Sequence, residues 1–249
     1  MNSADGRQST MAAWLLLAAV LTAGCSAAEP NPLPATPGSS ATPTPAPHPI
    51  DADKLLAATL PNGEIEPAGS TGKKVYERDP EWAPQSISDP DCALIMDPYR
   101  ERVQPTTVVQ SFNSKENAEW TAATELTAHP SPAAATTEFD RIRKAVQGCS
   151  DFHFRNKASG NGSGTRATLS TVQAPGQGDE AIAFDLTLWI DVSDINPDVK
   201  EIRTIHKYTM VRIGSVIADF SLSPSDSVET MQYPAELLTR QVQRLRDLP

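Results

Sequence analysis

The chain has 249 residues and a formal net charge of −10, from 31 acidic and 21 basic side chains. This balance argues against a nucleic-acid-binding protein, because binding to a polyanion depends on clustered positive charge. With 39% hydrophobic and 21% charged residues the chain can bury a core, and its 22 prolines exceed what one globular domain usually carries. The composition also excludes a polytopic membrane protein and a wholly disordered chain.

An apolar run over residues 11–23 follows a start with one cation, Arg7. The run is shorter than the roughly 20 residues of a membrane-spanning helix, so we expect residues 1–24 to be a signal peptide. It ends in Leu21-Thr22-Ala23-Gly24-Cys25, which resembles the lipobox of bacterial lipoproteins, with Thr22 in place of the commoner leucine. The resemblance implies that Cys25 carries a diacylglyceryl group and attaches the chain to the cell membrane. An ordinary secretory peptide with a coincidental cysteine is the alternative.

Residues 25–49 are rich in Pro, Ala and Thr and contain eight of the prolines. Such a segment cannot form a packed core, and alternating prolines favour an extended conformation. We therefore expect a tether between the lipidated Cys25 and a single domain over residues 50–249.

The remaining two cysteines, Cys92 and Cys149, form an even pair in a domain expected to be exported, so a disulfide is predicted. A reactive thiol at Cys149 with His153 is the weaker alternative. No set of residues has the spacing of a zinc site, and no metal or cofactor is expected.

The pattern after residue 50 predicts an α+β fold. Helical spacing of apolar residues predicts a short helix after Asp51, a second after Asp89, a third over residues 131–148 and a terminal one containing Leu238, Val242, Leu245 and Leu248. Alternating patterns predict strands over residues 106–112, 120–128, 152–155, 165–173, 180–192, 201–213 and 216–222. Strands in a run with flanking helices indicate an antiparallel, meander-like sheet rather than a parallel one.

The order of these elements, together with Gly178-Asp179-Glu180-Ala181 and the segment Val211-Arg212-Ile213-Gly214-Ser215-Val216, resembles actinobacterial lipoproteins related to the extracellular sensor domain of PknH-like kinases. The resemblance implies an extracytoplasmic α+β domain with a ligand-binding cleft. It also marks one departure: the PknH domain is described with two disulfides, whereas this domain has cysteines for one.

No motif for catalysis stands out. The four histidines accompany no G-x-S-x-G or S-x-x-K motif, and the glycine-rich residues 160–164 fit a hairpin loop better than a phosphate cradle. The segment 194–198 begins like a calcium loop, but Val199 stands where glycine is required. We therefore predict a protein that is not an enzyme.

The alternation of side chains along the predicted strand 180–192 provides one candidate ligand face. Ile182, Phe184, Leu186, Leu188 and Ile190 share the core side of residues 180–192, so Trp189, Asp185 and Asp191 lie on the other side. Tyr208 and Arg212 of the next strand join them if the register allows. An aromatic ring among polar residues can stack on a ligand, whereas packing of Trp189 under a helix or loop is the structural alternative.

These observations predict a membrane-anchored lipoprotein on the extracytoplasmic face, with a sensor-like domain that binds an unidentified small molecule, lipid, glycan or envelope protein. The alternative is a structural or interaction lipoprotein that docks onto another envelope protein without a small-molecule pocket.

Overall fold

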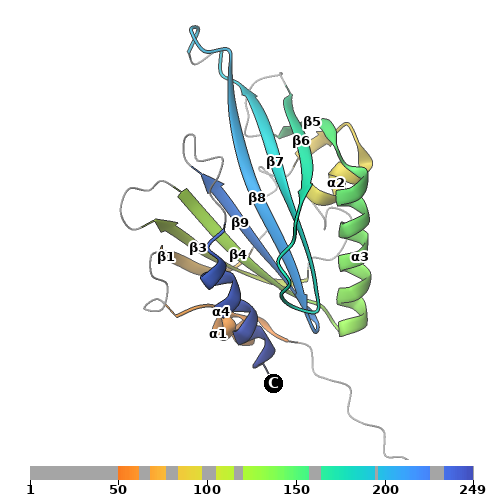
Figure 1. Ribbon diagram of the computed structural model, residues 1–249, viewed down its shortest axis with the longest axis vertical. Coiled ribbons are helices and arrows are strands. Elements are labelled where there is room, and N and C mark those ends of the chain that lie inside the picture. Colours follow the sequence, from red (N-terminus) through yellow and green to blue (C-terminus); the bar gives the residue numbers. More distant parts are fainter. Residues whose placement is uncertain are drawn as a thin grey trace, which may run out of the picture. The chain divides into compact units, whose positions relative to one another are not determined.

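The computed structural model describes residues 50–61, 68–76, 84–96, 105–114, 120–156, 164–193, 196–224 and 233–248 (Figure 1). The chain divides into two units, Met1–Pro45 and Ala46–Pro249, and every described residue belongs to the second. The signal peptide, Cys25 and the tether lie outside the described residues, so those expectations stay predictions.

The described residues form four helices and nine strands. In chain order these are α1 (Ala52–Ala58), β1 (Ala68–Val75), β2 (Pro84–Ile87), α2 (Pro90–Met96), β3 (Thr106–Ser114), β4 (Trp120–Ala128), α3 (Pro132–Gly148), β5 (Asp151–Asn156), β6 (Thr165–Val172), β7 (Glu180–Asp191), β8 (Glu201–Ile213), β9 (Val216–Pro224) and α4 (Ala235–Arg246).

The strands form one antiparallel sheet in the order β1-β3-β4-β9-β8-β7-β6-β5-β2. Strands β5 to β9 run as a meander, and β9 closes against β4 of the β3–β4 hairpin. The predicted α+β fold with a meander-like antiparallel sheet is therefore confirmed.

Helices cover both faces of the sheet. We call the face against α1 and α4 the α4 face, and the face against α2 and α3 the α3 face (Figure 1). Along β9 the core residues alternate: Ala218, Phe220 and Leu222 pack on the α4 face and Ile217 on the α3 face. The predicted core side of β7 is the α3 face, where Phe184 and Leu186 are buried.

Local sequence signals explain the helix starts. The Asp51 carboxylate accepts a hydrogen bond from the backbone N–H of Lys54 at 2.9 Å, and the Ser131 hydroxyl accepts one from Ala134 at 3.1 Å. Pro132 follows Ser131 at the first helical position, where the missing N–H costs nothing. Both helices therefore begin where the sequence predicts.

The predicted disulfide is present. Cys92 in α2 and Cys149 after α3 are bonded, with their Cα atoms 4.9 Å apart. Both sulfurs belong to the buried cluster of the α3 face. The bond fixes the seven-residue α2 to the end of the longest helix.

The sequence analysis did not predict the two edge strands, β1 and β2. Strand β1 contains Gly69, Gly72 and two lysines, and its pairing with β3 shifts by one residue between Ser70 and Gly72. Glycine and lysine are depleted in strands, and a bulge breaks the alternating pattern. Contacts with β3 and β5, distant in sequence, place these two edge strands.

Candidate functional site

The structure separates the five residues that the sequence analysis grouped as a ligand face. In the β7–β8 register Trp189 lies opposite Arg203, whereas Tyr208 lies opposite Phe184. Residues directly opposite each other share a face. Trp189, Asp185 and Asp191 therefore lie on the α4 face, and Tyr208 and Arg212 lie on the α3 face, so the five do not converge.

Trp189 is covered by one of the protein's own cations. Arg166 lies directly opposite it on β6, and the guanidinium carbon is 4.9 Å from the centre of the indole ring. Arg166 also donates to the Asp151 carboxylate at 2.7 Å. The ring thus forms a cation–π contact within the sheet.

Arg212 stabilises the turn between β8 and β9 and links it to the start of β7. Its guanidinium donates to Glu180 at 2.7 Å and to Asp179 at 3.0 Å, and Glu180 also bonds Arg143 of α3. These two arginines lower the pKa of the Glu180 carboxyl. The quoted Gly178-Asp179-Glu180 and Arg212-Ile213-Gly214 segments are therefore joined by an ion-pair network with a structural role.

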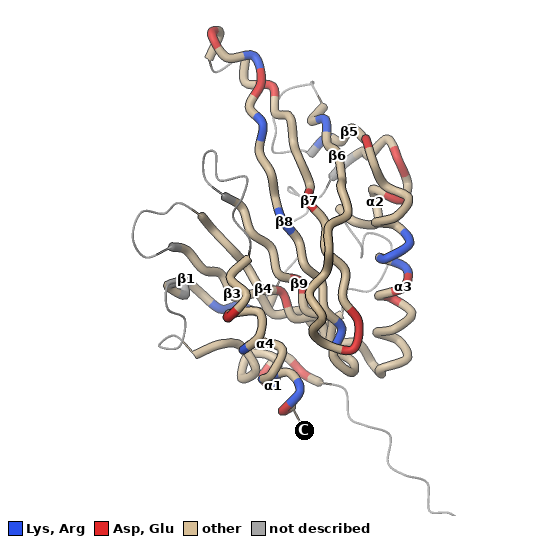
Figure 2. The backbone as a smooth tube through the Cα atoms, in the orientation of Figure 1, with Lys and Arg blue, Asp and Glu red and all other residues tan. Residues whose placement is uncertain are grey.

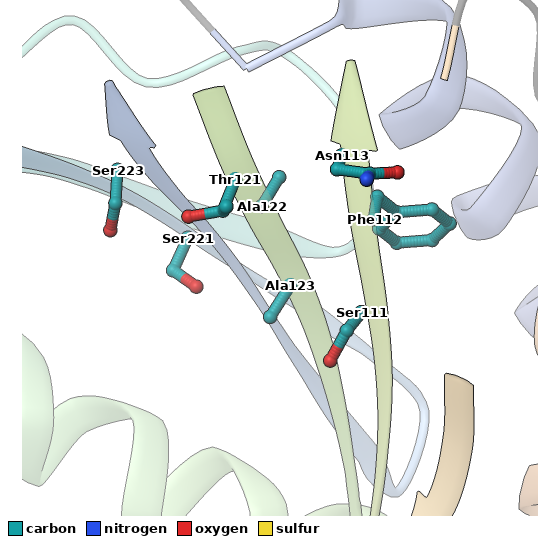
Figure 3. A pocket seen from close by; sticks show the side chains of 8 residues that line it. All are labelled: Ser111, Phe112, Asn113, Thr121, Ala122, Ala123, Ser221 and Ser223. Carbon is teal, nitrogen blue, oxygen red and sulfur yellow. The ribbon is translucent and has the colours of Figure 1, made fainter. Parts of the chain in front are cut away.

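A hollow lies on the α3 face over β3, β4 and β9. Its volume is about 340 Å³, within the range of small-molecule sites. Figure 3 shows the hydroxyls of Ser111, Thr121, Ser221 and Ser223 on one side of these strands and the Phe112 ring on the other. The lining residues are Ser111, Phe112, Asn113, Thr121, Ala122, Ala123, Ser221 and Ser223.

Register explains why hydroxyls gather there. Ala123 lies opposite Ser111 on one side and Ser221 on the other, and Thr121 lies opposite Asn113 and Ser223. Small and polar residues in these two adjacent rows leave the space that large side chains fill elsewhere on the sheet.

Tyr208 continues the row of Ser221 onto β8. Its ring stacks on Phe184 with a centroid separation of 5.1 Å, so one side of the phenol is fixed by the core. Burial raises the pKa of its hydroxyl, and the charges of Asp219 and Glu125 raise it further. Tyr208 is thus the one residue of the predicted ligand face that lies beside the hollow.

Two carboxyls occupy the next row of the same face. Glu125 of β4 and Asp219 of β9 are direct cross-strand partners, each two residues from a lining residue. Burial raises the pKa of both carboxyls, and the Glu125 charge raises that of Asp219 further. Like charges this close resist simultaneous ionisation.

One histidine contacts the hollow. His206 Nδ1 lies 2.8 Å from the Ser223 hydroxyl, and its Nε2 lies 3.5 Å from the Thr204 hydroxyl. Burial lowers the pKa of His206, which favours the neutral ring. A serine activated by histidine usually also has an acidic group orienting the ring, and among the described residues none bonds His206.

Within the described ranges no three His, Cys, Asp or Glu side chains are placed to hold a metal ion. The same residues include no helix with the length and hydropathy needed to cross a membrane.

Comparison with solved structures identifies the fold. The extracellular domain of PknH from Mycobacterium tuberculosis superposes with a TM-score of 0.56 at 14% sequence identity, over 80% of this chain and 97% of that one. The chain has the PknH extracellular-domain fold. An uncharacterised protein of Mycobacterium smegmatis, the Rv0999 ortholog, aligns with a TM-score of 0.43 at 12% identity, over 79% and 97% of the two chains. No family model and no curated protein matches the sequence.

The sequence contained part of the signal for the hollow. Polar Asp219, Ser221 and Ser223 alternate with apolar Ala218, Phe220 and Leu222 along one strand. The pairing of β9 with β4, which brings Thr121, Ala123 and Glu125 beside them, joins residues about a hundred positions apart and leaves no local pattern.

Proposed function

We propose that this protein is a lipid-anchored, extracytoplasmic lipoprotein whose sensor-like domain binds an envelope ligand in the hollow without chemical conversion. The observation that carries the proposal is the hydroxyl-lined hollow on the α3 face. Its floor is a sheet with cores packed on both faces, so the lining residues are held in place before a ligand arrives.

Three further observations support the cellular location. A buried disulfide persists in an oxidising compartment, and Cys25 follows a lipobox-like sequence. The fold shared with the PknH extracellular domain agrees with the same side of the membrane.

A docking protein without a small-molecule ligand is the second candidate. The β7–β8 hairpin extends past its neighbours, because pairing with β6 ends at Trp189 (Figure 1). Beyond that point Ile190 and Ile202 face each other across the hairpin and are 37% and 45% exposed. Figure 2 shows charges of both signs near this tip, which suits a protein surface better than a lipid one.

The anchor and the ligand need separate tests. Replacement Cys25→Ala is expected to abolish lipid labelling and to release the protein into the medium, whereas continued membrane retention contradicts the lipid anchor.

For the ligand, we would purify the full chain from an actinobacterial host and measure its native mass. The variant Ala123→Phe fills the hollow, and Ala133→Phe places the same ring on the exposed start of α3. We expect a bound species on the parent and on Ala133→Phe that is absent from Ala123→Phe. A species retained equally by all three places the ligand elsewhere, and bare masses throughout favour the docking protein.

A further inference from the structure

Two acidic residues lie beside the hollow. Glu125 and Asp219 face each other across β4 and β9 on the α3 face, adjacent to the row of Ala123 and Ser221. Both residues are half-buried. Neither residue is among those that line the hollow, and the pair borders its lining through this neighbouring row.

The carboxyl pair lacks internal partners. The Asp219 Oδ1 atom is enclosed and has no hydrogen-bond partner in the part of the chain that the structure describes. Native proteins pair most buried polar atoms, so an enclosed carboxyl oxygen without a protein partner leaves a position for a donor such as water or a ligand. Among the described residues, Glu125 also forms no hydrogen bond or ion pair.

The charged groups around the pair do not neutralise it. Along β8, Met210 lies opposite Asp219, and Arg212, two residues further, bonds Asp179 and Glu180. On α3, Glu138 and Arg141 bond each other. Other titratable groups on this face include Tyr208 and His206 of β8, the exposed Lys74, which lies opposite Val109, and the buried His129 after β4, which interacts electrostatically with Glu138.

The volume of the hollow suits a small ligand. A volume of about 340 Å³ holds a molecule near the size of one sugar ring with some water. Serine and threonine hydroxyls both donate and accept hydrogen bonds, which suits a hydroxylated ligand. A carboxylate pair selects a charged donor.

We propose that the hollow binds a hydroxylated primary amine of about one sugar ring, with its ammonium group between Glu125 and Asp219 and its hydroxyls toward Ser111, Thr121 and Ser221. This inference rests on the proposed function and specifies the chemistry of the same site. Binding of the cation draws both carboxyls into their ionised form. Protons held by the free pair are then released.

Calorimetry on the full chain in detergent micelles tests this with two probes, D-glucosamine and D-glucose, which differ by one amino group. Glucosamine is expected to bind at least about tenfold more tightly than glucose, as a charge-assisted hydrogen bond allows. Titrations in buffers of different ionisation heat are expected to show proton release, and affinity is expected to rise as pH rises from acid toward neutral.

The double variant Glu125→Gln with Asp219→Asn keeps the side-chain shapes and is expected to lose both the preference and the proton release. The control is Asp191→Asn with Glu201→Gln, another cross-strand Asp–Glu pair, which is exposed on the hairpin and should change neither.

Three outcomes overturn the inference. Equal binding of the two sugars leaves a ligand-binding hollow that does not select an amine, so the proposed function stands. Glucosamine binding that survives in the Glu125/Asp219 variant places the amine elsewhere. If neither probe gives heat at millimolar concentration, the amine is rejected. The native masses of the parent, Ala123→Phe and Ala133→Phe then test the proposed function separately.

Discussion

Removal of the disulfide is expected to destabilise the domain strongly. The bond joins residues 57 positions apart, and for a loop of this length the chain-entropy relation gives about 4 kcal/mol. In a domain of this size that corresponds to a fall in melting temperature of roughly 8–16 °C. The loss should begin at α2, because a seven-residue helix has little stability of its own.

Urea unfolding of the parent with and without reductant, beside the double variant Cys92→Ala/Cys149→Ala, measures this effect. We expect the reduced parent to lose about 4 kcal/mol and the variant somewhat more, because the alanines also leave space in the buried cluster. Unfolding midpoints that are unchanged by reductant would refute the reasoning that the cross-link stabilises the fold through its long loop.

Three more predictions concern the turn, the carboxyl pair and the histidine. Gly178 has φ of +76°, and an added Cβ would lie 2.2 Å from Val211 Cγ1 and 2.8 Å from the Arg212 carbonyl. Gly178→Ala should therefore cost about 2–4 kcal/mol in urea unfolding, against about 1–2 kcal/mol for Gly214→Ala, which has φ of +56° and open space; equal losses contradict the steric argument. Folding raises the pKa of the Glu125 and Asp219 carboxyls. Their contribution to stability is therefore complete below the pKa values of the unfolded chain, near pH 4, and is lost as the pH rises through the pKa values of the folded protein. As the pH rises from about 4 to neutral, the free energy of unfolding of Glu125→Gln/Asp219→Asn should increase relative to that of the parent. Parallel plots of unfolding free energy against pH for the two proteins would contradict the raised pKa values. A fluorophosphonate probe should not label Ser223, because no described carboxylate orients His206; labelling that disappears in Ser223→Ala would indicate a hydrolase.

Local patterns predict most of the fold. The Ser131-Pro132 start, the buried Phe139, Ile142 and Val146 stripe and the end at Gly148 define α3 from the sequence alone, because capping and helical periodicity are local properties. The long strands β7 and β8 follow from alternation in the same way. Edge strands such as β1 are set by a distant partner and are therefore missed.

The site depends more on register than the fold does. Parity along β7 correctly assigned Ile182, Phe184 and Leu186 to the core side, but it could not determine which β8 residues lie beside Trp189. A shift of one residue moves a whole strand's side chains to the other face, and the observed register places Tyr208 away from Trp189. The hollow additionally requires the β4–β9 pairing, which no sequence pattern signals.

The most direct test of a ligand in the hollow is photo-cross-linking in living cells. A photoreactive amino acid would replace Thr121, an exposed lining residue, or Ala133, an exposed residue at the start of α3. Mass spectrometry of the peptides is predicted to find a reproducible small-molecule adduct at position 121 and none at position 133. A protein-sized cross-link at position 121, or the same adduct at both positions, would contradict a small-molecule site in the hollow.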